Sequence, residues 1–255
     1  EPDSSSAGWT AQQVAQAIKA AGDRLQSAGF TPNFVAPSVT NAANAPVFID
    51  RIASTPGAMQ YVGEFSYHRY CCVFDDVLQG IAARAVQFNK RTAMLELIGA
   101  DHNTLHKDLS LARNSSWQQY VLAGPVEWGT DDGSRYYLID DENPANPSVI
   151  MGSRTKFLRQ YFRFIRAGAQ RIEARSSDGI FDPLAFINPN GKYVLVVKAA
   201  AGGSFNVQGL PPGVYGVKYT TASQYDVDLP DITVTQGPPV NAAIPAAGVI
   251  TIYAR

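Results

Sequence analysis

The sequence predicts a mixed fold, in which an α/β region of parallel strand–helix units is followed by an all-β region. Up to about residue 125, apolar runs typical of strands alternate with segments of helical periodicity, which is the pattern of parallel β/α units. Beyond about residue 150, short alternating strands follow one another with turn residues between them, which is typical of an antiparallel β-sandwich. The pattern changes near residue 140, so we expect two domains, 1–140 and 141–255.

The α/β region begins with a helix. Thr10 and Gln13 offer a capping box, apolar residues then recur at helical spacing as far as Ala28, and Gly29 ends the run. A short strand over 34–36 follows and ends at Pro37. The remaining elements expected here are helices over 45–54, 75–88 and 105–112 and strands over 61–70, 94–99 and 117–123.

The all-β region is predicted from its turns and from the apolar runs between them. Strands are expected over 191–198, 214–219, 231–234 and 248–253. No charged pair or histidine stands out among them, so we expect this domain to be structural.

Composition and charge exclude several classes of function. The chain has 255 residues, enough to bury a large core, and it is 45% hydrophobic and 17% charged. Its formal net charge is −1 and no polybasic run occurs, which argues against nucleic-acid and membrane partners. The aromatic, proline and glycine content is typical of a loop-rich secreted protein, so we expect a secreted or extracellular location.

The cysteines and two of the histidines offer weak signals. Cys71 and Cys72 are adjacent, and neighbours rarely bridge because the ring is strained, so we expect two small core residues at a strand end. The alternative is that one pairs with a cysteine outside this chain. His102 and His106 are four apart on an expected helix, but no third ligand is apparent, so we expect a solvated helix face rather than a metal site.

One carboxylate stands in an apolar run. Glu96 lies within residues 92–100, where an isolated charge is costly unless it is paired, hydrated or employed in chemistry. An edge position, or the polar face of a helix, would also explain it. Four strands with their helices make about half of a (β/α)₈ barrel, whose chemistry lies at the C-terminal ends of the strands. His68 lies near the end of the second expected strand, and Glu1 precedes the first helix.

These residues stand in motifs that resemble retaining glycoside hydrolases of clan A, most closely glycoside hydrolase family 30, with families 39 and 79 as relatives. Four segments are similar to the ends of barrel strands four, six, seven and eight: Glu1-Pro2, 66–70 (SYHRY), 94–96 (MLE) and 116–120 (SWQQY). Residues 161–172 and 244–251 are similar to segments of the side domain of that family. The chain lacks the asparagine that usually precedes the first motif, and Leu95 and Tyr120 stand where a small polar residue and a tryptophan are usual.

The resemblance implies a site as well as a fold. It implies the C-terminal half of the barrel, strands five to eight, followed by the β-sandwich. Glu96 would be the nucleophile and Glu1 the general acid/base of a double displacement on a β-linked glycosidic bond, with the two carboxyl groups about 5 to 5.5 Å apart. The substrate-binding residues would be Tyr67, His68, Trp117, Tyr120 and Trp128. Tyr67 and His68, on the preceding strand, would also supply hydrogen bonds to Glu96. No cofactor or metal is implied.

Each of these residues also has a structural explanation. Glu1 would be an exposed terminal residue, His68 a satisfied core histidine, and the aromatic residues core side chains. The protein would then be a catalytically inactive carbohydrate-binding relative or an interaction protein. Because strands five to eight leave parallel edges uncovered, we expect an N-terminal barrel half as partner, supplied by a processed chain, a separate subunit or a longer protein.

Overall fold

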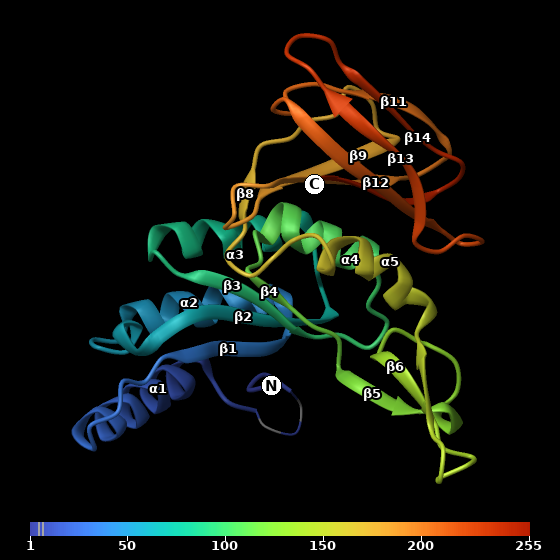
Figure 1. Ribbon diagram of the computed structural model, residues 1–255. Coiled ribbons are helices and arrows are strands. Elements are labelled where there is room, and N and C mark those ends of the chain that lie inside the picture. Colours follow the sequence, from blue (N-terminus) through green and yellow to red (C-terminus); the bar gives the residue numbers. More distant parts are fainter. Residues whose placement is uncertain (5, 7) are drawn as a thin grey trace. The chain divides into compact units, whose positions relative to one another are not determined.

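The computed structural model describes residues 1–4, 6 and 8–255 (Figure 1). The chain divides into two compact units. The first comprises Glu1–Ala100 and Lys107–Ile139, and the second comprises Asp101–His106 and Asp140–Arg255. Among the described residues, no helix combines the length and the apolar character that crossing a membrane requires.

The first unit is built on a parallel sheet with helices between its strands. The sheet has the order β1-β2-β3-β4, and each neighbouring pair is parallel. Its strands are β1 (Phe34–Asn41), β2 (Val62–Cys71), β3 (Arg91–Glu96) and β4 (Ser116–Trp117). The helical segments are α1 (Ala11–Ser27), η1 (Ala42–Asn44), α2 (Ala45–Ser54), η2 (Met59–Tyr61), α3 (Asp75–Gln87) and the π-helical turn η3 (Asp108–Ala112).

The helices of this unit bury one apolar face against the sheet. Ile18 of α1, Ile49 of α2 and Leu78 of α3 share one cluster with Phe65 of β2 and Met94 of β3. Each such side chain contributes about 1.5 to 3 kcal/mol when it is fully buried. This cluster covers the helix side of the sheet.

Most elements lie where the sequence pattern predicts them, but the helix expected over 105–112 begins earlier, at His102, and gives way to η3 at Asp108. Thr10 caps α1, and the predicted capping box with Gln13 is confirmed. β1 does not stop at Pro37 but continues to Asn41, because its pairing with β2 shifts register between Pro37 and Val39, and a residue without an N–H is tolerated at such an irregularity. The strand expected over 94–99 begins earlier and ends at Glu96.

The strand expected over 117–123 is interrupted. β4 ends at Trp117, and β5 (Val121–Pro125) begins after a bend. β5 pairs in parallel with β6 (Arg135–Asp140), and the 3₁₀ turn η4 (Val126–Trp128) lies between them.

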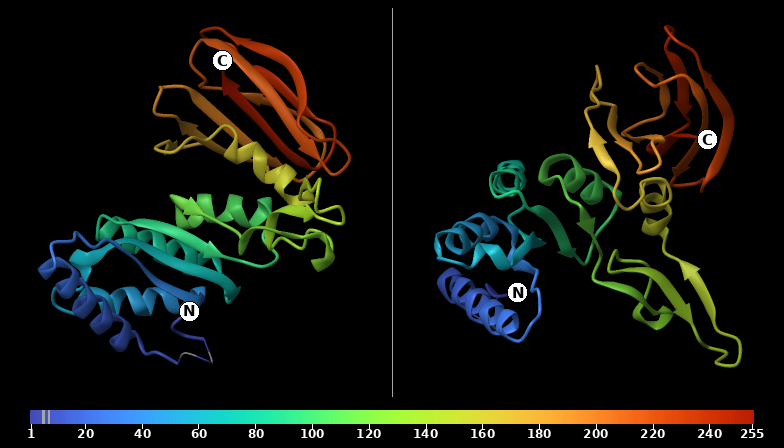
Figure 2. Two further views of the ribbon diagram at one scale, coloured as in Figure 1. Left: turned by 60° about the horizontal axis from the view of Figure 1, so that its bottom comes forward. Right: turned by 60° about the vertical axis from the view of Figure 1, so that its left-hand side comes forward.

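The second unit is dominated by antiparallel strands, coloured orange to red in Figure 2. Six strands form a sheet of order β13-β12-β15-β10-β9-β8, and β11 and β14 form a separate pair. Side chains of β14, among them Ala242 and Ile244, join the same core as Val197, Tyr219 and Ile252 of the large sheet. The elements are β7 (Ser148–Met151), α5 (Ser153–Phe162), β8 (Gln170–Ile172), β9 (Phe181–Ile187), β10 (Tyr193–Ala199), β11 (Gly203–Val207), β12 (Gly213–Thr221), β13 (Val227–Val234), β14 (Val240–Ile244) and β15 (Gly248–Ala254).

The two helical histidines are not on a solvated face, so that prediction is wrong. They belong to α4 (His102–Lys107). His106 is buried, and its Nδ1 lies 2.8 Å from the hydroxyl of Tyr161. His102 stacks on Phe157, and burial lowers the pKa of His102 to about 4 despite the attraction of the neighbouring Asp101. Single-sequence periodicity does not reveal that His102 and His106 belong to the second unit and pack within it.

Candidate functional site

Three side chains that the sequence analysis selected meet at the C-terminal ends of the parallel strands. The Nδ1 atom of His68 lies 3.0 Å from a carboxylate oxygen of Glu1 and 3.9 Å from one of Glu96. One oxygen of each carboxylate and the ring nitrogen all lie within 4.8 Å of one another. The His68 side chain is only 7% exposed, whereas those of Glu1 and Glu96 are 37% and 27% exposed. A buried imidazole therefore lies beneath two carboxylates that remain open to solvent.

A β-bulge turns Glu96 toward this group. Tyr67 of β2 is paired with Met94 of β3, but the next residue, His68, is paired with Glu96, so Leu95 is an extra residue. In a regular strand, Glu96 would point to the same face as Met94, which is buried in the core. The extra residue reverses that alternation and brings Glu96 to the face of His68. This explains how an acid can stand at the end of an apolar run without being buried.

Asp3 fixes the segment that carries Glu1. The backbone N–H groups of Thr40 and Asn41 donate to the Asp3 carboxylate at 2.6 and 3.1 Å, and the Asn44 side-chain amide donates at 2.9 Å. Partial burial opposes the charge of Asp3, but these hydrogen bonds outweigh it and lower the pKa of Asp3. The ionised Asp3 thus ties the segment to the end of β1, close to His68.

Tyr70 and Ser38 complete the site, and the sequence analysis did not select either one. The Tyr70 hydroxyl donates to Glu96 at 2.8 Å. Burial and the Glu96 carboxylate raise the pKa of Tyr70, so it stays protonated and acts as a donor. Tyr70 lies two residues beyond His68 on β2, and residues at this spacing share one face of a strand. The sequence could therefore have indicated that Tyr70 faces the same site as His68. The Ser38 hydroxyl lies 3.3 Å from Nε2 of His68 and gives its second ring nitrogen a partner.

The expectation that Tyr67 supplies a hydrogen bond to Glu96 is wrong. Adjacent strand residues point to opposite faces, so Tyr67 lies on the helix side while His68 faces the carboxylates. Tyr67 is fully buried, and its hydroxyl donates at 2.7 Å to Asp108 of η3. It therefore cannot contact a substrate bound at Glu96.

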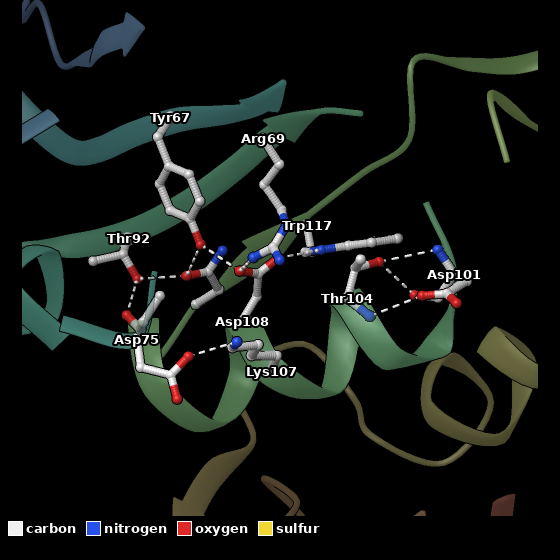
Figure 3. A network of polar contacts seen from close by, with 11 residues as sticks. Tyr67, Arg69, Asp75, Thr92, Asp101, Thr104, Lys107, Asp108 and Trp117 are labelled. Atoms are coloured by element: carbon white, nitrogen blue, oxygen red, sulfur yellow. Dashed lines mark hydrogen bonds and ion pairs between the residues drawn. The ribbon is translucent and has the colours of Figure 1, made fainter. Parts of the chain in front are cut away.

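Asp108 is the centre of a buried polar network (Figure 3). Besides Tyr67, the Arg69 guanidinium pairs with it, and the indole N–H of Trp117 donates to it at 2.9 Å. Burial raises the pKa of Asp108, although Arg69 and the donors favour its charged form. Trp117 was expected to contact the substrate, but its N–H is held by Asp108 and its ring packs against the core. Its position assigns it to this network.

The other expected substrate contacts lie farther along the chain. Tyr120 is 51% exposed between β4 and β5, and Trp128 is 61% exposed in η4. The expectation for Cys71 and Cys72 is wrong, because they form a disulfide with each other directly after Tyr70. Cys71 is exposed rather than buried in a core.

The chemistry of the cluster is that of two carboxylates bridged by an imidazole. One carboxylate has a permanent donor in Tyr70, and the other is held next to the imidazole nitrogen. Two carboxylates and an imidazole are also suitable ligands for a divalent cation. Glu1, His68 and Glu96 are thus the residues that could hold a metal ion, and the two uses would exclude each other.

Comparison with known proteins supports the fold. No protein-family model matches the chain, and no curated protein matches its sequence. A family 30 endoxylanase from Clostridium papyrosolvens C71 matches with a TM-score of 0.72 and 18% identity over 96% of this chain and 61% of that one. Xylanase C from Talaromyces cellulolyticus matches with a TM-score of 0.74 and 17% identity over 96% and 57%. The endo-β1,6-glucanase BT3312 matches with a TM-score of 0.63 and 15% identity over 94% and 52%.

This chain therefore spans about three fifths of the length of the two xylanases that it resembles. The resemblance to family 30 that the motifs predicted is confirmed at the level of the fold, and nearly all of the chain has the fold of glycoside hydrolase family 30 enzymes.

Proposed function

We propose that this chain forms the second half of a retaining glycoside hydrolase that cleaves β-linked glycosidic bonds. The observation that carries the proposal is the pair Glu1 and Glu96, which have oxygen atoms within 4.8 Å of each other and are both open to solvent. In retaining enzymes the carboxyl groups lie about 5 to 5.5 Å apart, whereas inverting enzymes need about 6.5 to 9.5 Å for a water molecule between them. The observed spacing favours retention.

In the first step, a Glu96 oxygen attacks the anomeric carbon while the bond from that carbon to the departing oxygen breaks. Glu1 gives its proton to the departing oxygen. The electron pair of the broken bond leaves with that oxygen, and the sugar remains as an ester on Glu96. In the second step, Glu1 takes a proton from water, whose oxygen attacks the anomeric carbon and releases Glu96.

Tyr70 and His68 each contact one of the two carboxylates and orient it. The Tyr70 hydroxyl donates to one Glu96 oxygen and fixes the orientation of that carboxylate. His68 has its Nδ1 toward Glu1 and its Nε2 toward Ser38, so the ring can carry its proton on Nδ1 and donate to Glu1. This bond would hold Glu1 in the orientation from which it protonates the departing oxygen.

The proposed architecture is half of a (β/α)₈ barrel, with β1 to β4 as barrel strands five to eight and the antiparallel unit as a β-sandwich side domain. Its support is the parallel sheet order, the two sheet edges that no strand of the described residues covers, and the solved family 30 structures, which extend well beyond the length of this chain. The enzyme would be active only with the first barrel half. The Cys71–Cys72 disulfide favours a secreted or extracellular location, because disulfides persist in oxidising compartments.

The test uses the complete protein, with both barrel halves, on xylan and on β-linked glucans, since these are the kinds of substrate named for similar structures. We expect the first product to keep the configuration of the cleaved bond when proton NMR is recorded at early times. Glu96→Gln should lose turnover and keep glycan binding. A product of inverted configuration, or full turnover by Glu96→Gln, would refute the mechanism. Glycan binding without turnover by the unaltered protein would favour the inactive carbohydrate-binding relative.

A further inference from the structure

The Cys71–Cys72 disulfide directly follows Tyr70, the residue whose hydroxyl donates to Glu96. The sequence contains no other cysteine, so the pair has no alternative partner within this chain. Cys71 is exposed, so a reagent in solvent can reach the disulfide. The pair therefore joins a redox-sensitive bond to a residue of the candidate site.

The pairing of β2 with β1 is irregular where Tyr70 stands. Tyr67 is paired with Val39 and Cys71 with Asn41, so four residue steps along β2 correspond to two along β1. Among the described residues, this irregularity leaves Tyr70 without a partner in β1.

The other neighbouring strand, β3, does not hold Tyr70 either. Its pairing with β2 ends where His68 lies opposite Glu96, two residues before Tyr70. The Tyr70 residue is 38% exposed, so packing restrains its ring only in part. The position of the hydroxyl therefore depends on the backbone that follows Tyr70.

The disulfide fixes that backbone. A bridge between adjacent cysteines closes a ring that includes the planar peptide bond between them, so it fixes ψ of Cys71 and φ of Cys72. Cys72 has a φ of 57°, in the left-handed region that a residue with a side chain rarely adopts. Once the ring is open, this backbone can return to the more favourable extended or helical regions. Because Tyr70 is joined directly to Cys71, such a change moves Tyr70 relative to Glu96.

We propose that the Cys71–Cys72 disulfide positions Tyr70 at Glu96, and that a dithiol reductant that opens this disulfide lowers the activity of the site while the fold is kept. The inference rests on the proposed function, in which Tyr70 orients the nucleophile. It adds a redox-sensitive modification site to that function. Because disulfides persist in oxidising compartments, the site has its full activity there.

The reaction at this site is a thiol–disulfide exchange. A thiolate of the reductant attacks the sulfur of Cys71, the S–S bond breaks, and the sulfur of Cys72 leaves and takes up a proton. The second thiol of the reductant then attacks the mixed disulfide, releases Cys71 as a thiol and closes the disulfide of the reductant. Two electrons and two protons thus pass from the reductant to the cysteines.

The experiment measures kcat of the complete protein on an aryl glycoside before and after treatment with dithiothreitol. Alkylation and mass spectrometry confirm that both cysteines are reduced. We expect kcat to fall by about threefold to tenfold, which is at most the loss in Tyr70→Phe, and to recover after reoxidation. The melting temperature of the reduced protein should stay well above the assay temperature.

A double variant shows whether the effect comes from this disulfide. Cys71→Ser combined with Cys72→Ser should have the kcat of the reduced protein and should not respond to dithiothreitol, even if other disulfides of the complete protein are opened. Should the double variant fail to fold, the reduced and alkylated unaltered protein takes its place. A response of the double variant to the reductant would assign the effect to another bond and overturn the inference.

Two tyrosine variants show whether the effect passes through Tyr70. In Tyr70→Phe the hydroxyl is already absent, so reduction should change kcat by less than twofold. Tyr67→Phe is the matched control on the other face of β2, and reduction should lower its kcat as much as in the unaltered protein. An equal loss in both variants, or an unchanged kcat after complete reduction, would overturn the inference.

Failure of the proposed function would look different, because no variant would show turnover in either redox state. Hydrogen exchange then decides without catalysis. Reduction should speed amide exchange of a peptide over residues 68–74 and leave a peptide over residues 62–67 of the same strand unchanged. Equal exchange of both peptides before and after reduction would refute the positioning role.

Discussion

The Tyr70 hydroxyl donates to the Glu96 carboxylate at 2.8 Å, across the pair of strands that bring these two residues together. A hydrogen bond to a charged group contributes about 1.5 to 3 kcal/mol. Removing it with Tyr70→Phe should therefore lower kcat on an aryl glycoside by about tenfold or more, with little change in the melting temperature. Tyr67→Phe is the matched control. It removes a hydroxyl from the other face of the same strand, so it should leave kcat unchanged and cost stability instead. Equal kcat values for the two variants would exclude a role for Tyr70 at the nucleophile.

The two carboxylates should respond unequally to removal. Glu96→Ala should abolish the glycosyl-enzyme intermediate for every substrate, because the attacking oxygen is lost. Glu1→Ala should keep substantial activity on aryl glycosides with good leaving groups, which depart without protonation.

Azide provides the check on this assignment. The intermediate of Glu1→Ala lacks a base to activate water, so added azide should attack it directly and give a β-glycosyl azide from a β-linked substrate. Product analysis by NMR distinguishes the outcomes. Equal loss in both variants without an azide product would mean that the roles are misassigned. An azide of inverted configuration from Glu96→Ala alone would place the acid/base elsewhere.

Asp3 should stabilise the protein in a pH-dependent way. Its pKa in the folded protein is lowered from the ordinary value of 3.8, so the unfolded chain binds the proton more tightly. The stabilisation is therefore fully present above pH 3.8 and is lost as the pH falls through the lower pKa of the folded state. Asp3→Ala should reduce the free energy of unfolding at pH 7 by about 1 to 3 kcal/mol, since three donors lose their acceptor.

Urea unfolding across the pH range measures that difference. The gap between the unaltered protein and Asp3→Ala should be constant near neutrality and should narrow below pH 3.8. The same variant should lose glycosidase activity, because the segment carrying Glu1 is released. A gap that widens in acid would contradict the assignment of Asp3 as an ionised anchor.

The Asp108 network should matter for stability and not for chemistry. Asp108→Ala leaves the Arg69 guanidinium buried without its partner, and breaking a buried ion pair in this way costs about 3 to 5 kcal/mol. We expect a much lower melting temperature, with kcat per folded active site close to that of the unaltered protein. Active-site titration with a mechanism-based glycosyl inhibitor counts the folded sites. A loss of kcat at an unchanged melting temperature would mean that Asp108 acts in catalysis.

Much of the secondary structure could be predicted from the sequence, because the interactions that determine it are local. The capping box at Thr10 and Gln13 lies within one helical turn, and the helices over α1, α2 and α3 follow from apolar spacing. The pairing of Glu1 with Glu96 was expected only through the family resemblance, since nothing local joins residues so far apart in the chain. The structure brings them together through β2 and His68.

What the sequence did not reveal depends on register and on distant packing. Alternation along β2 separates Tyr67 from His68, but which of them faces the helices is decided by the core around Phe65 and Met94. Asp108 carries no local signal, because its partners come from other elements of the unit. His106 was expected in solvent because its periodicity cannot show the Tyr161 hydroxyl that covers it.

The extra residue at position 95 makes the orientation of the proposed nucleophile depend on how β3 pairs with β2. A relative without this residue would need no bulge, because its acid would follow the core methionine directly and regular alternation would place it on the face of His68. A relative that keeps all three residues of 94–96 but pairs them in regular alternation would instead turn the acid toward the core, although an alignment would score the same letters. When active and inactive members of such a family are sorted, the pairing of β3 with β2 is thus as informative as the identity of the acid itself.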